Sequence, residues 1–347
     1  MNEATGSGPA YPAAIDIHAH GVPEEFVAEI ARTGLAGVDA REEEGKYFLT
    51  FPGLKPLRPV AGVMMNFAGR TGWLDDQDVS AQMIAPWLDV HGQQLPPADG
   101  QQWVRLLNDC MAAAVAGAGG RLMAHATVHL ADPEAAAREL DRAHSELGMR
   151  GCMIPTNTPG GFLDEPRFDA LWEAAAGLGI PIILHPPTEA PSSPAFERYP
   201  RLRTLARAVD TTIVAAALLT TGVLERYPAL KLVLVHGGGY LPYQIGRLDQ
   251  AFAGGEDLLP SEYLRQVLFD TTALTPEAVR MLLSYVGADH VMVGSDYAAT
   301  SVQPAWATHS LTSNVRQATA GRSGEEDLVL HVNAQRYFPS PADKRSR

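Results

Sequence analysis

The chain alternates short aliphatic runs with longer amphipathic stretches, and eight of the short runs have the length and build of strands. Near-continuous Val, Ile and Leu runs of this kind are typical of parallel strands that are buried on both faces. The eight predicted strands are Ala14–His20, Ser80–Pro86, Arg121–Leu130, Gly151–Pro155, Pro181–His185, Lys231–His236, Val267–Thr271 and Val291–Asp296.

Helical periodicity fills the intervals between these strands. Asp132 followed by Pro133 predicts a helix start, because Asp caps N-termini and Pro suits the first helical position. Eight strands alternating with helices indicate an α/β fold, the (β/α)8 TIM barrel. The predicted helices are Gly100–Ala118, Pro133–Leu147, Phe168–Leu178, two stretches flanking Gly222, one after Gly237, Pro276–Val286 and Asp327–Phe338.

One barrel domain over residues 14–338 accounts for most of the chain. Apart from a helical start around Glu24–Arg32, no clear strand and helix pair occupies residues 22–77, which we interpret as an insertion arm with a hairpin at Gly45–Gly53. An insertion after the first strand is expected over the C-terminal mouth of the barrel. Residues 1–13 are expected to be a flexible N-terminus, and 339–347 a C-terminal tail.

Composition narrows the function classes. A formal net charge of −13 repels phosphate backbones and anionic lipid, so we expect no nucleic acid and no membrane partner. No apolar run is long enough to span a bilayer, and the start lacks the features of a signal peptide, which predicts a cytoplasmic protein. Cys110 and Cys152 are expected to be buried, reduced thiols.

Candidate chemistry gathers at the predicted strand ends. His18 and His20 project from the same face of the first strand, and His185, His236 and Asp296 follow three others. Barrels carry their active sites at this C-terminal face. Three imidazoles and one carboxylate favour Zn(II), with Mn(II) or Fe(II) as alternatives and water in the open position. None of the four lysines ends a strand, so no carbamylated lysine bridges two metals and one divalent metal ion is expected.

Other polar features receive structural interpretations. The triple glycine Gly237–Gly239 is expected to let the backbone approach a ligand beside His236. Arg247 lies in an otherwise apolar helix, where it can extend toward water or pair with Asp249 or Glu262. The remaining histidines are assigned ordinary structural roles: His91, His125, His129, His144, His290, His309 and His331.

Several motifs together resemble the amidohydrolase-related family that includes aminocarboxymuconate-semialdehyde decarboxylase and other metal-dependent aromatic acid decarboxylases. These motifs are Asp16–His20, His185–Pro186, Gly222–Lys231, His236–Gly239, Pro242–Arg247 and Gly294–Tyr297. The resemblance implies metal ligands at His18, His20, His185 and Asp296, with His236 as a catalytic histidine. It also implies a homodimer in which Arg247 reaches the partner's site to bind a substrate carboxylate.

The arm departs from this family pattern. The decarboxylase that names the family looks to have an arginine after its first strand, in a Phe-Arg-Val-Val segment. The matching stretch here, Lys46–Phe51, contains no arginine. Arg58, further along, is a candidate replacement. The difference favours another small-molecule carboxylic acid, an aromatic one held by Trp87, Phe51 and Tyr297.

These observations predict a metal-dependent decarboxylase, without an organic cofactor, that acts on an aromatic or unsaturated carboxylic acid. Asp296 would protonate the carbon that bears the carboxylate, His236 would move a proton or hold a substrate oxygen, and Arg247 and Arg58 would bind carboxylates. The alternatives are a hydrolase of a lactone or amide-type bond, a hydratase of an unsaturated dicarboxylate, and an inactive binding protein.

Overall fold

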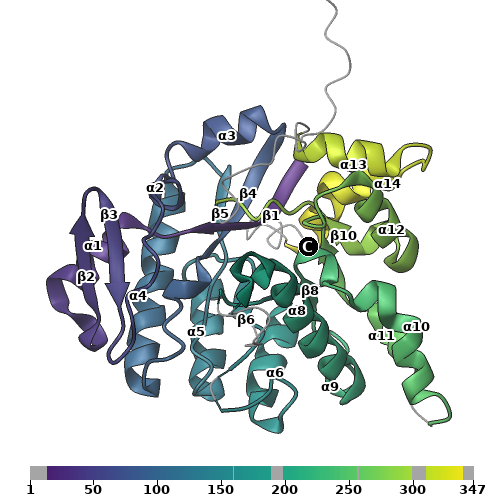
Figure 1. Cartoon of the computed structure of the whole chain (residues 1–347), viewed down its shortest axis with the longest axis horizontal. Coiled ribbons are helices and arrows are strands. Elements are labelled where there is room, and N and C mark those ends of the chain that lie inside the picture. The colour runs from purple at the N-terminus through teal and green to yellow at the C-terminus, as the bar shows by residue number, and fades with distance from the viewer. Residues whose placement is uncertain (1–13, 159, 189–197, 256–257, 299–309, 339–347) are drawn as a thin grey trace, which may run out of the picture.

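A computed structural model describes residues 14–158, 160–188, 198–255, 258–298 and 310–338, and it contains the expected barrel (Figure 1). Eight parallel strands form two sheets, ordered β1-β4-β5 and β10-β9-β8-β7-β6. Parallel bridges from Ala19 to Tyr297 and from Ala126 to Cys152 join the two sheets into a closed ring. The strands are β1 (Ala14–Gly21), β4 (Val79–Pro86), β5 (Leu122–Ala124), β6 (Cys152–Pro155), β7 (Ile182–His185), β8 (Leu232–Leu234), β9 (Leu268–Asp270) and β10 (Val291–Met292).

Helices surround the barrel, and most lie where periodicity predicts them. Asp132 caps its helix as expected, with its Oδ1 accepting a hydrogen bond from the Ala135 amide at 3.0 Å. These helices are α1 (Glu24–Thr33), α4 (Pro97–Ala116), α5 (Pro133–Ser145), α6 (Asp169–Leu178), α8 (Arg203–Thr220), α9 (Val223–Arg226), α10 (Leu241–Phe252) and α12 (Pro276–Val286). Four short helices were not predicted: α2 (Gly62–Met65), α3 (Arg70–Asp76), α11 (Pro260–Leu264) and α13 (Leu311–Thr319).

The end of the chain closes the N-terminal end of the barrel. α14 (Glu325–Asp327), a π-helical turn (Leu328–Val332) and α15 (Asn333–Tyr337) follow one another directly, where one helix was predicted. Phe338 packs with barrel-interior residues such as Ile17 and Leu268. Asn333 donates hydrogen bonds to the carbonyl oxygens of Ala288 and Val291, just before and at the start of β10. The opposite, C-terminal end is therefore the one left for a site.

The insertion arm differs from the prediction in its position. Its hairpin consists of β2 (Asp39–Glu43) and β3 (Lys46–Thr50), and it lies beside α1 and α4 at the outer edge of the molecule (Figure 1). The Phe51 ring is buried against Trp103 of α4, with ring centroids 5.2 Å apart. The hairpin therefore does not cover the mouth, because its apolar residues pack on the helical layer. Only the segment after it, residues 54–58, returns to the mouth.

The cysteines and the termini can also be compared with the sequence predictions. Cys152 is buried in β6, whereas Cys110 of α4 is only half-buried, and both are free thiols. Burial raises the pKa of Cys110 to about 11 and raises that of Cys152 as well. The predicted N-terminal segment 1–13 and tail 339–347 lie outside the described residues. Among the helices that the structure describes, none is both long and apolar enough to cross a bilayer.

Candidate active site

Four side chains from three strand ends converge at the C-terminal end of the barrel. One ligand atom from each of His18, His20, His185 and Asp296 lies within 4.8 Å of the others, and all four residues are buried. Oδ1 of Asp296 is 3.0 Å from Nε2 of His20, 3.5 Å from Nε2 of His18 and 4.0 Å from Nε2 of His185. Ligands of one tetrahedral ion at about 2.1 Å are separated by roughly 3.4 Å, which matches this spread.

The chemistry of these donors fits a divalent metal ion. Nε2 of His185 is buried and has no hydrogen-bond partner among the described residues, whereas its Nδ1 donates to the Pro186 carbonyl at 2.8 Å. Burial and the neighbouring imidazoles hold the pKa of His185 well below its usual value, so Nε2 carries a lone pair. Burial opposes charge on Asp296, but hydrogen bonding to His20 and the nearby imidazoles hold its pKa well below the usual range. Neutral imidazoles and an ionised carboxylate are the forms that bind metal.

Asp270 orients His18, and sequence reasoning missed it. Its Oδ2 lies 2.6 Å from Nδ1 of His18, both side chains being fully buried. Because a carboxylate only accepts, Nδ1 carries the proton and Nε2 faces the other ligands. Burial lowers the pKa of His18, but the bond and charge of Asp270 outweigh it and raise the pKa overall. Oδ1 of Asp270 also accepts from the Gly237 amide at 2.9 Å, which links His18 to the loop after β8.

A second buried network holds β1 against the segment after β10. Asp16 accepts from the Ser295 hydroxyl at 2.6 Å and from Nε2 of Gln82 at 2.8 Å. Oε1 of Gln82 accepts from the buried guanidinium of Arg70 at 3.1 Å, and Arg70 also donates to the carbonyl of His20. Burial lowers the pKa of Arg70 to about 10, so it stays charged at neutral pH. This network fixes the backbone that carries His18, His20 and Asp296.

His236 follows β8 in a tight 3₁₀ turn, η5 (His236–Gly238), and its backbone φ is +57°. Its Nε2 lies 3.8 Å from Oδ2 of Asp296, and its ring centroid lies 5.0 Å from that of His185. Its side chain is 18% exposed, more than any of the four ligands. His236 therefore faces the candidate metal position from the solvent side.

The glycines after His236 allow close packing of the turn, and the expected approach of this backbone to a ligand stays a prediction. Gly239 has φ +64°, and a Cβ there would lie 2.3 Å from the Ala208 carbonyl oxygen of α8. A Cβ at Gly238, with φ +76°, would lie 2.7 Å from the Phe269 ring. The positive φ angles and these contacts exclude other residues. Close packing of this turn on α8 and β9 is the structural use that we find for the run.

The predicted aromatic residues lie in different places. Trp87 is nearly buried, with the Arg58 guanidinium 4.5 Å from its ring centroid. Arg58 also pairs with Asp89 at 3.2 Å and donates to the Thr188 hydroxyl at 3.1 Å, shortly after His185. The Tyr297 ring stacks on Trp73 of α3 with centroids 4.0 Å apart. Arg58 and Trp87 thus lie together at the mouth, whereas Tyr297 packs toward α3 and Phe51 packs on α4.

Arg247 is exposed on α10. The two carboxylates considered as its partners are engaged elsewhere, since Asp249 accepts from the Ser261 amide and Glu262 from the Leu259 amide, both at 2.9 Å. Of the seven remaining histidines, His309 lies outside the described residues, and none of the six others is in the four-residue cluster. His91 and His125 bond to backbone carbonyls at 3.0 Å, as structural histidines do.

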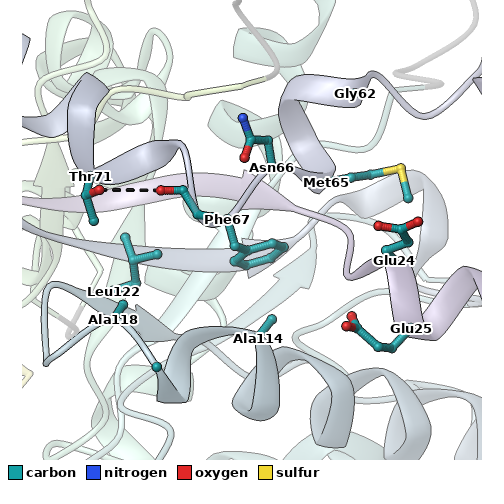
Figure 2. A pocket seen from close by; sticks show the side chains of 12 residues that line it. Glu24, Glu25, Gly62, Met65, Asn66, Phe67, Thr71, Ala114, Ala118 and Leu122 are labelled. Atoms are coloured by element: carbon teal, nitrogen blue, oxygen red, sulfur yellow. Dashed lines mark hydrogen bonds between the residues drawn. The ribbon is translucent and has the colours of Figure 1, made fainter. Parts of the chain in front are cut away.

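Two cavities differ in their relation to this centre. One, of about 770 Å³, lies between α1, α2, α3 and α4 on the outside of the barrel, with Glu24, Phe67 and Thr71 among its lining residues (Figure 2). No candidate ligand lines it. The other, of about 830 Å³, is lined by residues following β4, β6 and β7, including Leu88, Asn157 and Thr188. Only the second lies at the barrel end that carries the ligand cluster.

Known proteins share this fold and sequence pattern. Over 300 residues the chain is 25% identical to 2-amino-3-carboxymuconate-6-semialdehyde decarboxylase of Dictyostelium discoideum, covering 82% of this chain and 81% of that protein. The crystal structure of 5-carboxyvanillate decarboxylase from Sphingomonas paucimobilis superposes with a TM-score of 0.77 at 24% identity, over 95% of this chain and 100% of that one. The dihydroxybenzoic acid decarboxylase of Polaromonas sp. JS666 was solved with bound manganese and 2-nitroresorcinol. It superposes with a TM-score of 0.75 at 20% identity, over 97% of this chain and 98% of that one.

The family model described as amidohydrolase matches residues 15–339, which is nearly the whole chain. That span contains the barrel strands, except for the first residue of β1, and all four clustered ligands. The resemblance expected from the sequence motifs is thereby confirmed, and the chain belongs to the amidohydrolase family.

Proposed function

We propose that this protein is a metal-dependent decarboxylase of an aromatic or unsaturated carboxylic acid. The observation that carries the proposal is the buried Nε2 of His185, which lacks a hydrogen-bond partner among the described residues and faces Oδ1 of Asp296 at 4.0 Å. Two ligands of one ion have this separation, whereas a hydrogen bond does not. Decarboxylases among the family relatives support the reaction class.

His18, His20, His185 and Asp296 would hold one divalent ion, Zn(II) or Mn(II). When bound, the ion supplies a positive charge that polarises a substrate oxygen and stabilises the electrons left by departing carbon dioxide. Asp270 and the Pro186 carbonyl fix the ring orientation of His18 and His185 for this purpose.

Asp296 would act on the proton that replaces the carboxylate. Its depressed pKa means that it starts ionised, so it must first accept a proton from a substrate hydroxyl or from His236. It then donates that proton to the carbon bearing the carboxylate, the carbon–carbon bond breaks, and carbon dioxide leaves while its bonding electrons remain on the ring. His236, 3.8 Å from Oδ2 of Asp296, is placed to exchange the proton or to hold the substrate oxygen.

Arg247 would bind the substrate carboxylate in the site of a second copy. Its exposure on α10 and the engagement of Asp249 and Glu262 leave its guanidinium without an ion pair among the described residues. Helix α10 and the helices beside it also expose large apolar side chains, which is typical of a surface covered by another subunit. These residues are Leu205 and Ile213 of α8, Phe252 of α10, and Met281 and Tyr285 of α12.

The test is carbon dioxide release by purified protein loaded with Zn(II) or Mn(II), over a panel of hydroxybenzoates and muconates. The proposal predicts turnover that is lost on chelation, restored by metal, and absent from His185→Ala. Lactones, amides and unsaturated dicarboxylates are assayed in parallel. Hydrolysis or hydration without carbon dioxide release would replace the decarboxylase with one of those activities.

A further inference from the structure

The cavity at the C-terminal end of the barrel is basic although the protein is acidic. Lys55, Arg58 and Arg203 line its volume of about 830 Å³, in a chain whose formal net charge is −13. Asp89 is the one acidic residue among the described residues that line it, and Arg58 already pairs with it at 3.2 Å. The cavity therefore presents an excess of positive charge, which attracts an anion.

Arg207 is a fourth cation, one helical turn after the cavity-lining Arg203. It follows Arg203 by four residues on α8, so both side chains project from the same face of the helix. Its Nε is inaccessible to solvent and has no hydrogen-bond partner among the described residues. Asp210, the nearest carboxylate on the same helix, accepts a hydrogen bond from Thr156, at the end of β6.

Charged residues of both the cavity and the candidate metal centre act on the pKa of Arg207. Burial and the charge of Arg58 lower the pKa of Arg207, whereas the charges of Asp296 and Asp89 raise it. Arg58 lines the cavity, and Asp296 belongs to the ligand cluster. A buried guanidinium donor without a partner is unfavourable, and an anionic ligand group would satisfy it.

Arg58 keeps donors for the same anion. Its Nε bonds to Asp89 and its Nη2 to Thr188, and its plane lies over Trp87. Since a guanidinium has five N–H groups, others remain to bind a carboxylate. Thr188 lies three residues after His185, which ends β7, so the cavity and the ligand cluster occupy the same end of the barrel.

We propose that Arg58, Arg203 and Arg207 form a subsite, the arginine subsite, for a second carboxylate of the substrate, which makes the substrate a dicarboxylic acid. This inference rests on the proposed function, because it places the reacting carboxylate at the metal centre and the retained carboxylate at the arginine subsite. The arginine subsite belongs to the same chain as the metal ligands, unlike Arg247.

Binding of an unreactive diacid tests the arginine subsite without requiring turnover. Isothermal titration calorimetry compares isophthalate with benzoate on metal-loaded wild type, Arg207→Gln, Arg207→Lys and Arg226→Gln. Arg226 is the matched control, since it pairs with Asp169 on the outside of the barrel. We expect isophthalate to bind at least about tenfold more tightly than benzoate, and Arg207→Gln to weaken isophthalate binding by about tenfold or more. Benzoate binding should stay within about twofold, with Arg207→Lys intermediate and Arg226→Gln unchanged.

Three results would overturn the arginine subsite: equal affinity for both acids in wild type, no binding of isophthalate, or an equal loss for both acids in Arg207→Gln. Carbon dioxide release from the acid panel is measured separately. Diacid binding that depends on Arg207 without carbon dioxide release keeps the subsite and refutes the decarboxylase. Release that is insensitive to Arg207→Gln keeps the decarboxylase and refutes the subsite.

Discussion

Nδ1 of His18 lies 2.6 Å from Oδ2 of Asp270, and the same carboxylate accepts the amide of Gly237 next to His236. One buried aspartate therefore orients both a candidate metal ligand and the loop of the candidate catalytic histidine. Asp270 is not one of the clustered ligands and acts through His18, so we regard it as a positioning residue.

Asp270→Asn should weaken metal binding by about 10- to 100-fold, the usual scale for a group that orients a ligand histidine. The amide keeps the size of the carboxylate but removes the negative charge that fixes the His18 tautomer. Competition with a chelating dye measures the affinity. Asp289→Asn, an exposed position beside His290, is the matched control and should leave the affinity unchanged. Equal affinities of wild type and Asp270→Asn would show that His18 needs no such support.

One divalent ion should be bound per chain, and His185→Ala should lose it. Elemental analysis of purified protein measures the content, and two ions per chain would contradict the single site. Chelation should lower the melting temperature of wild type, since a ligand at about 100 times its Kd contributes about 2.7 kcal/mol to stability. The melting temperature of His185→Ala should not respond to chelator.

His236→Ala should retain the metal while kcat falls by about 10²-fold or more, the scale of a lost general acid or base. The reason is that His236 lies beside Asp296 on the solvent side but is not one of the four clustered ligands. Metal content and turnover are measured on the same preparation, with His331→Ala as a control on a helix face. Loss of metal in His236→Ala would instead make His236 a ligand, and unchanged turnover would remove it from the chemistry.

Arg247→Ala should leave metal content intact and weaken substrate binding by about 2–5 kcal/mol, the cost of truncating one partner of a buried charge pair. If Arg247 completes the site of a partner subunit, mixing Arg247→Ala with His185→Ala should restore activity. After complete exchange of a homodimer, about a quarter of all sites would have both groups intact. Exchange is verified with differently tagged chains. Exchange without recovered activity would restrict Arg247 to its own chain or to no role.

The residues at the strand ends were predictable for two reasons. Aliphatic runs identify the strands, and parallel strands of a barrel all end at the same face of it. This rule predicts that His18, His20, His185, His236 and Asp296 lie together, and the family resemblance singles out all but His236 as metal ligands. Asp270 was missed because it was read as part of the strand Val267–Thr271. A carboxylate at the end of the short buried strand Leu268–Asp270 was the available signal, since a buried charge needs a partner.

Features that depend on tertiary partners were not predictable. The strand Asp39–Glu43 is acidic and exposed, and it exists because Lys46–Thr50 pairs with it. The burial of Arg70 could not be predicted from the sequence, because it depends on hydrogen bonds to Gln82 and to the carbonyl of His20. The sequence shows Arg207 only as one residue of a predicted helix, because the burial of its unpartnered Nε depends on the fold.

The backbone at His236 and Asp296 has φ of +57° and +56°, a region that costs a side-chain-bearing residue about 1–2 kcal/mol. Glycine would relieve that cost at either position while removing the imidazole or the carboxylate. Selection for heat resistance and selection for chemistry therefore oppose each other at these two positions. A variant library screened for thermal stability alone would enrich glycine at position 236 and discard the catalyst while improving the fold.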